Sequence, residues 1–185
     1  MRLESRATTS IEVRTLEPAA GEDARLLDHL RDLINSVYAT TESGLWRTGA
    51  TRTTPSELVE LIRAREVVVA VSADEIVGSV RLHDISDDLS EFGLLVAAPE
   101  RRGTGIGRAL LDFAEGSSRD RGLRAMQLEL LLPRGWKHPE KEFLKAWYGR
   151  RGYRLSRIST VEDAYPHLAP LLATPCDLAI YEKPL

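Results

Sequence analysis

The residues best suited to chemistry form a glycine-rich segment, PERRGTGIGR, from 99 to 108. It follows an apolar run typical of a strand and precedes a run with helical spacing. Glycines let main-chain N–H groups point at a ligand with no Cβ in the way. The first turn of a helix adds unpaired N–H groups and the positive end of its dipole. The segment, with Arg102 and Arg108 as added charges, is therefore predicted to bind a phosphate or pyrophosphate.

Three phosphate-binding patterns can be tested against this segment. A Walker A loop needs Gly-x-x-x-x-Gly-Lys-Ser/Thr, which does not occur in the chain. The dinucleotide pattern Gly-x-Gly-x-x-Gly fails because Arg108 and Leu110 stand where its last glycine should be. The third pattern, Arg/Gln-x-x-Gly-x-Gly/Ala, is satisfied by Arg102, Gly105 and Gly107. A tight strand-to-helix connection without a ligand would not need three glycines beside arginines.

Hydrophobic periodicity predicts the elements that position this turn. We expect strands near residues 11–14, 67–71, 76–82, 92–98, 124–132, 153–158 and 177–182, and helices over 23–38, 106–119, 140–150 and a short stretch from 54. The run 92–98 is nearly all apolar, which favours a strand buried on both faces. Residues 83–89 and 160–174 are predicted to be irregular. The order β-α-α-β-β-β-α-β-α-β-β indicates an α/β protein.

Composition sets the class of protein. The 185 residues suit one domain, and 43% are hydrophobic, which is enough for a core. A net charge of -3 gives no general attraction to nucleic acid. Residues 1–6 lack the apolar core of a secretion signal, and no apolar run is long enough to span a bilayer. We expect a cytoplasmic protein without nucleic-acid or membrane partners, with its lone Cys176 buried. The four histidines show no metal-ligand spacing, so no metal is predicted.

The segment 91–111 resembles the acetyl-CoA-binding motif of the GNAT superfamily of N-acetyltransferases, with Pro99, the arginine and both glycines at the family's spacing. The segment 147–153 (WYGRRGY) is similar to the family's aromatic-Tyr-x-x-x-Gly-aromatic pattern. The resemblance extends from about Val67 to Tyr153. It implies a single N-acetyltransferase domain over 1–185. The implied fold is a mixed sheet of about seven strands, flanked by about four helices, whose fourth and fifth strands splay apart.

The resemblance also implies the co-substrate, acetyl-CoA, and its binding residues. In the family, pantetheine enters the gap between the splayed strands and pairs with the backbone of the fourth. The corresponding residues here are Leu95, Val96 and Ala97. The pyrophosphate contacts would come from Arg102, Gly103, Thr104, Gly105, Ile106, Gly107 and Arg108.

Catalytic roles follow from the same resemblance. Tyr148 matches the tyrosine that often protonates the leaving sulfur, and a phenol is a suitable donor. Glu91 matches a glutamate at the start of the fourth strand that serves as a base in some members, usually through water. Glu129 is a second candidate, His83 and Asp84 are weaker ones, and water alone can also serve. The implied reaction is transfer of the acetyl group to a primary amine by direct attack in a ternary complex.

One region departs from the family pattern. The stretch between Glu129 and Tyr148 is several residues longer than usual, and Lys141 stands where many members have an asparagine that contacts the cofactor. The added loop 133–139 and the segment 165–168 are expected to shape the acceptor pocket. We expect His138 and His167 to be solvent-exposed, and the acidic run from His83 to Asp88 to be a solvated loop.

Several alternatives stay open at this stage. The chain could be a non-catalytic module that binds or senses acyl-CoA, or a nucleotide-binding domain of another kind, which the failed motifs disfavour. The acyl length of the donor and the presence of a homodimer are not fixed by the sequence. The acceptor could be an antibiotic, a polyamine, an amino acid or a peptide N-terminus.

Overall fold

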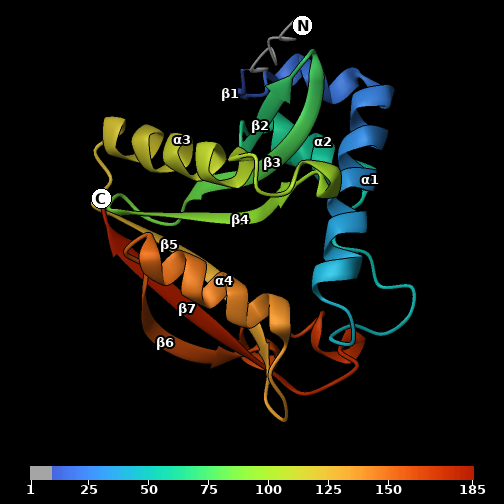
Figure 1. Cartoon of the computed structure of the whole chain (residues 1–185), viewed down its shortest axis with the longest axis vertical. Coiled ribbons are helices and arrows are strands. Elements are labelled where there is room, and N and C mark those ends of the chain that lie inside the picture. Colours follow the sequence, from blue (N-terminus) through green and yellow to red (C-terminus); the bar gives the residue numbers. More distant parts are fainter. Residues whose placement is uncertain (1–9) are drawn as a thin grey trace, which may run out of the picture.

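A computed structural model describes residues 10–185; residues 1–6, where the sequence lacks a secretion signal, lie outside the described part. One seven-stranded mixed sheet runs through it in the order β1-β2-β3-β4-β5-β7-β6 (Figure 1). Its strands are β1 (Glu12–Thr15), β2 (Val67–Ser72), β3 (Glu75–Asp84), β4 (Leu89–Ala97), β5 (Ala125–Pro133), β6 (Arg154–Thr160) and β7 (Cys176–Pro184). The helices are α1 (Ala24–Thr41), α2 (Pro55–Arg63), α3 (Ile106–Asp120), α4 (Pro139–Arg150) and the short α5 (Val161–Ala164). The α/β class and the mixed sheet expected from the sequence are confirmed.

Helices cover both faces of the sheet, and strand alternation divides the side chains between them. On β2, Val67 and Val69 pack with the α1 and α2 side chains, whereas Val68 and Ala70 pack with those of α3. Helix α2 begins in a complete capping box, in which Thr54 accepts from the Glu57 amide and the Glu57 side chain accepts from the Thr54 amide. These two layers fix α1 and α3 on opposite sides of β4.

The sheet is discontinuous at its centre. β4 and β5 run parallel and pair only from Leu89↔Ala125 to Glu91↔Gln127, after which they separate. Figure 1 shows the two strands diverging from the side near the C-terminus. On the far side of the gap, β5 and β7 pair along their whole length, from Ala125↔Pro184 to Pro133↔Cys176. The expected splay of the fourth and fifth strands is therefore present.

The observed elements correct the sequence prediction in three places. The stretch 83–89 is not all loop, because β3 continues to Asp84 and β4 already begins at Leu89. The run 92–98 is not buried on both faces, because the strand separation leaves Leu94 and Leu95 half-exposed. The stretch 160–174 contains α5 and a 3-10 turn at Ala169–Leu171. Cys176 is fully buried, as predicted.

No helix among the described residues has the length and apolar character needed to cross a membrane.

Candidate active site

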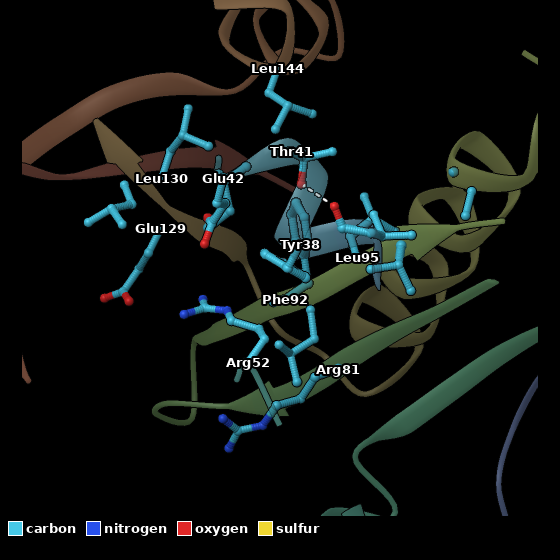
Figure 2. A pocket seen from close by; sticks show the side chains of 18 of the residues that line it. Tyr38, Thr41, Glu42, Arg52, Arg81, Phe92, Leu95, Glu129, Leu130 and Leu144 are labelled. Atoms are coloured by element: carbon cyan, nitrogen blue, oxygen red, sulfur yellow. Dashed lines mark hydrogen bonds between the residues drawn. The ribbon is translucent and has the colours of Figure 1, made fainter. Parts of the chain in front are cut away.

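A cavity of about 980 Å³ occupies the gap between β4 and β5. Its walls come from the C-terminal end of α1, the loop before α2, the second half of β4, the glycine-rich turn, β5, α4 and the segment around Tyr165. These parts are distant in sequence, and the strand separation brings them to one space. Figure 2 shows side chains from several of them turned into this cavity.

The β4 main chain forms one wall. Ser79 pairs with Val96 and Arg81 with Gly93, so β4 carries an extra residue in a bulge at Leu94 and Leu95. Leu94 has a left-handed φ of 49°, which reorients the local backbone. The Ala98 amide donates to Val77 O on β3, and strand alternation directs the Ala97 amide to the opposite edge. Beyond Glu91 that edge has no β5 partner, so its backbone groups face the gap.

The glycine-rich turn closes the end of β4. Gly103 and Gly105 have left-handed φ values of 83° and 93°, and Gly105 is the N-cap residue of α3. A Cβ at either glycine would meet no atom within 4 Å, so the positive φ, rather than lack of space, requires glycine. Ile106 is buried, and its Cγ2 would lie 2.6 Å from a Cβ on Gly78, so this close contact seats α3 against β3.

The predicted pyrophosphate residues lie largely together. Those that line the cavity are Arg102, Gly103, Gly105, Ile106, Gly107 and Arg108. Thr104 is not among them, and its hydroxyl donates to Arg101 O at 2.7 Å. The Arg102 guanidinium donates to both Glu140 carboxylate oxygens, at 2.8 and 3.3 Å, and lies 5.3 Å from the Phe143 ring centroid. Of the expected β4 residues, Leu95, Val96 and Ala97 all line the cavity, although the Val96 side chain also packs against α1.

Tyr148 extends from α4 into an aromatic group below β4. Its side chain is 5% exposed and lines the cavity. Its ring lies 5.7 Å from Phe92, 4.9 Å from Trp147 and 6.0 Å from Tyr153, measured between centroids. Burial raises the pKa of Tyr148 above its ordinary value, so the phenol keeps its proton at neutral pH. The position suits a proton donor held in fixed orientation.

Two carboxylates, one on β4 and one on β5, also line the cavity. Glu91 is in the interior of β4, only 14% exposed, rather than at the strand end that the sequence predicted. Its Oε2 accepts from Gln127 at 2.6 Å and its Oε1 lies 3.7 Å from His83 Nε2. Burial raises the Glu91 pKa, partly offset by the Gln127 hydrogen bond. Glu129 on β5 accepts from the Tyr165 hydroxyl at 2.6 Å.

His83 is half-buried beside Glu91, and burial lowers its pKa, which favours the neutral imidazole. Asp84 points elsewhere, since both of its carboxylate oxygens accept from Arg121. The run 83–88 is thus not simply a solvated loop, because His83 lines the cavity while Asp84 and Asp88 pair with arginines.

Lys141 is committed to a buried ion pair. Its ammonium donates to Glu42 Oε1 at 2.5 Å, and the two side chains are 3% and 4% exposed. Trp46 Nε1 donates to the other Glu42 oxygen at 2.6 Å. Burial alone would raise the Glu42 pKa, but Lys141 and Arg52 lower it below its ordinary value. The residue that replaces the family's asparagine therefore joins α4 to the end of α1.

The loops expected around the acceptor divide into two groups. Tyr165 and Leu168 line the cavity, but His167 does not. The added loop 133–139 lies outside it and borders a separate hollow of about 420 Å³. His138 is not exposed as predicted; it is 6% exposed, with its Nε2 3.2 Å from Ser43 O, because it precedes α4 beside the buried ion pair.

Several cavity residues were missed by sequence reasoning, among them Tyr38, Arg52 and Arg81. Tyr38 lies at the end of α1, Arg52 lies in the loop before α2, and Arg81 lies on β3. Arg52 stands in a stretch rich in threonine and glycine, where no periodicity indicates which way a side chain points. Only the helical spacing of α1 carried a signal, because Tyr38 follows Ile34 by four residues. Among residues 10–185, no group of three or more His, Cys, Asp or Glu side chains is arranged to hold a metal ion.

Comparisons with known proteins agree with this geometry. A family model described as "Acetyltransferase (GNAT) domain" matches residues 63–155, which is half of the chain, and the resemblance seen in the sequence is thereby confirmed. A search of curated proteins finds no significant match.

Solved structures share the fold at low sequence identity. A ribosomal-protein-alanine N-acetyltransferase from Brucella melitensis is 18% identical, with a TM-score of 0.67 over 94% of this chain and 99% of that one. The PaiA N-acetyltransferase from Thermoplasma acidophilum, solved with coenzyme A, is 19% identical, with a TM-score of 0.67 over 95% and 99%. YncA from Salmonella typhimurium, described as a putative acetyltransferase and solved with acetyl-CoA, is 13% identical, with a TM-score of 0.67 over 96% and 95%.

Proposed function

We propose that this chain, which belongs to the GNAT acetyltransferase family, transfers an acetyl group from acetyl-CoA to a primary amine by direct attack in a ternary complex. The observation that carries the proposal is the free edge of β4. It begins where β5 separates and leads to the glycine-rich turn, and both border one cavity. In a donor that combines an amide-bearing arm with a pyrophosphate, the arm would pair with the β4 edge and the pyrophosphate would reach the glycine-rich turn.

The residues present fit coenzyme A. Main-chain groups of Leu95 and Ala97 would pair with the amides of the pantetheine arm, as an added strand would. Amides from Gly103 to Arg108, at the N-terminus of α3, would bind the pyrophosphate. Two of the solved relatives in this fold contain coenzyme A or acetyl-CoA, which supports the same choice of donor.

The reaction requires that the amine lose a proton, that the tetrahedral oxyanion be stabilised and that the departing thiolate gain a proton. The acceptor nitrogen would attack the thioester carbon and form the C–N bond as the carbonyl oxygen becomes an oxyanion; the C–S bond would break when this tetrahedral intermediate collapses. A β4 amide near Val96 or Ala97 would stabilise the tetrahedral oxyanion. Tyr148, which burial keeps protonated at neutral pH, would give its proton to the departing thiolate. Glu91 would accept the proton that the amine loses, directly or through water; Glu129 is the second candidate.

Thiol release tests the proposal. The full chain is incubated with acetyl-CoA and one amine at a time from four classes: an aminoglycoside, a polyamine, an amino acid and a peptide. Free thiol is measured, and mass spectrometry checks for the acetylated amine. We expect thiol release that depends on one class of amine. Propionyl-CoA and butyryl-CoA in the same assay define the acyl length.

Calorimetry with coenzyme A, in competition with ATP and NAD, separates the alternatives. Tight coenzyme A binding with no acetylation of any amine would favour a non-catalytic acyl-CoA sensor. Preference for ATP or NAD would contradict the donor itself.

A further inference from the structure

Arg52 is held in the cavity by main-chain and aromatic contacts. The Asn35 side chain on α1 fixes the backbone of the loop: its Oδ1 accepts from the Arg52 and Thr53 amides at 2.8 and 3.0 Å, and its Nδ2 donates to Thr53 O at 3.0 Å. The guanidinium lies 4.9 Å from the centroid of the Tyr38 ring and 5.9 Å from that of Trp46. Its position is therefore set before any ligand binds.

The Arg52 guanidinium has no carboxylate within salt-bridge distance among residues 10–185. Other arginines of the cavity wall do: Arg81 lies 2.7 Å from Glu66, and Arg102 lies 2.8 Å from Glu140. The acid that acts most strongly on Arg52, Glu42, already pairs with Lys141 and Trp46. The residue remains solvent-accessible, so its planar set of N–H donors is open to a ligand.

The surrounding charges restrict what that ligand can be. Figure 2 shows the Arg52 guanidinium and the Glu42 and Glu129 carboxylates turned into the same part of the pocket. Because Glu42 already pairs with Lys141, Arg52 and Glu129 are the charged groups of this region that have no ion-pair partner among residues 10–185. Glu91 lies beside His83, whose lowered pKa favours the neutral imidazole, so Glu91 also keeps its negative charge available. A polyamine would meet repulsion at Arg52, and a doubly charged phosphate would meet it at the two glutamates. A molecule with one ammonium and one carboxylate could place its positive charge near the two glutamates and its negative charge at Arg52.

We infer that Arg52 binds a carboxylate of the acceptor, so the acceptor class is an amine that also carries a carboxylate. The inference rests on the proposed acetyl transfer and adds its substrate class. The guanidinium would pair with the carboxylate through two parallel N–H···O bonds, a geometry that lysine cannot reproduce. The amine would then lie on the side of Glu91 and Glu129, next to the β4 edge.

Pairs of amines that differ only by a carboxylate test this inference. We would compare L-phenylalanine with phenethylamine, L-lysine with cadaverine, and γ-aminobutyrate with propylamine, in the thiol-release assay. The parent should prefer the carboxylate member of at least one pair. Arg52→Gln should lose about 10- to 100-fold in kcat/KM for that member, mainly through KM, and change little for its partner. Arg52→Lys should recover only part of the loss.

Arg124→Gln is the matched control, because Arg124 is exposed, pairs with Asp88 and lies outside the cavity. It should leave both members unchanged, and coenzyme A affinity should be equal in all variants. Equal loss for both members in Arg52→Gln, or a parent that prefers the member without a carboxylate, would overturn the inference while leaving acetyl transfer intact.

A binding measurement separates this inference from the proposed function. The parent loaded with coenzyme A is titrated with N-acetyl-L-phenylalanine, N-acetyl-γ-aminobutyrate and N-acetylphenethylamine. Binding of an acetylated acid that Arg52→Gln abolishes supports the carboxylate site even if no amine is turned over. If neither acid binds better than the neutral amide, the carboxylate site is wrong.

Discussion

The two ends of the cavity are built differently. The end we assign to the donor is bordered mainly by main-chain groups of β4 and of the turn 102–108, with the side chains of Arg102 and Arg108 beside them. At the end we assign to the acceptor, the contacts are side chains, among them Tyr38, Arg52 and Glu129. Backbone contacts depend on φ angles and strand pairing, whereas side-chain contacts change with single substitutions. The first end suits a constant donor, and the second can be altered for a particular acceptor.

The largest expected effect comes from breaking the buried ion pair that joins α4 to the end of α1. Lys141→Met should lower the free energy of unfolding by about 3–5 kcal/mol, because it leaves the buried Glu42 carboxylate without its cation. Denaturant unfolding measures this loss. Combining the change with Glu42→Gln should restore part of it. Since the pKa of Glu42 is lowered in the folded protein, its contribution is present above its unfolded pKa and lost as pH falls through the folded one.

Lys145→Met is the matched control, because Lys145 lies on the same helix and pairs with Glu142 at 3.0 Å in a partly exposed site. It should cost less than about 1 kcal/mol. Equal destabilisation by both variants would show that the buried pair has no special role.

Tyr148→Phe sharpens the comparison at the centre of the cavity. Loss of the phenolic proton should lower kcat by about 10²-fold while coenzyme A affinity stays within about twofold. Steady-state kinetics and calorimetry measure the two quantities. Tyr153→Phe is the control: its hydroxyl donates to Glu115 at 3.1 Å outside the cavity, so stability should fall and kcat should not. Full activity of the Tyr148 variant would exclude it as the acid.

Gly105→Ala tests only the donor end of the cavity, where the glycine-rich turn lies. The left-handed φ of 93° disfavours any side chain by roughly 1–2 kcal/mol, so the turn should relax and coenzyme A affinity should fall about tenfold. Gly116→Ala within α3, where a Cβ would also meet nothing within 4 Å, should leave affinity unchanged and stabilise the helix slightly. Unaltered affinity in Gly105→Ala would mean that the turn conformation does not govern donor binding.

The smallest effect concerns the base. Glu91 must lose its proton to act, and burial raises its pKa, so kcat should decline as pH falls towards that raised pKa. Glu91→Gln should lower kcat about fivefold to tenfold near neutral pH and flatten the decline of kcat at low pH. The loss is smaller than the roughly 10²-fold or more that a dedicated base contributes, because water can also accept the proton. Glu162→Gln, on the exposed surface, should leave the pH profile as it is. If Glu129→Gln flattens that decline instead, Glu129 is the base.

Sequence reasoning selected residues that line the cavity where the determinants are local. The turn 102–108 could be located because its glycines and the helix start lie within a few residues, and Tyr148 because its helix carries an aromatic pattern; their roles in binding and catalysis stay predictions. Glu91 was expected at a strand end, since no local signal shows that β4 starts at Leu89. The Lys141–Glu42 pair could not be found, because its two residues are 99 positions apart. Arg52 could not be found, because no periodicity in its loop shows which way the side chain points.

The buried ion pair also determines how far the cavity can change its width. The two halves of the sheet share only three residue pairs, from Leu89 to Glu91. At the opposite end, Lys141 and Glu42 connect them again, and Arg47 and Ala173 amides donate to Leu171 O and Leu45 O across the same boundary. Contacts at both ends of the opening oppose a hinge-like separation of the two halves. We therefore expect substrate entry and exit to depend on side chains and loops at the mouth of the cavity.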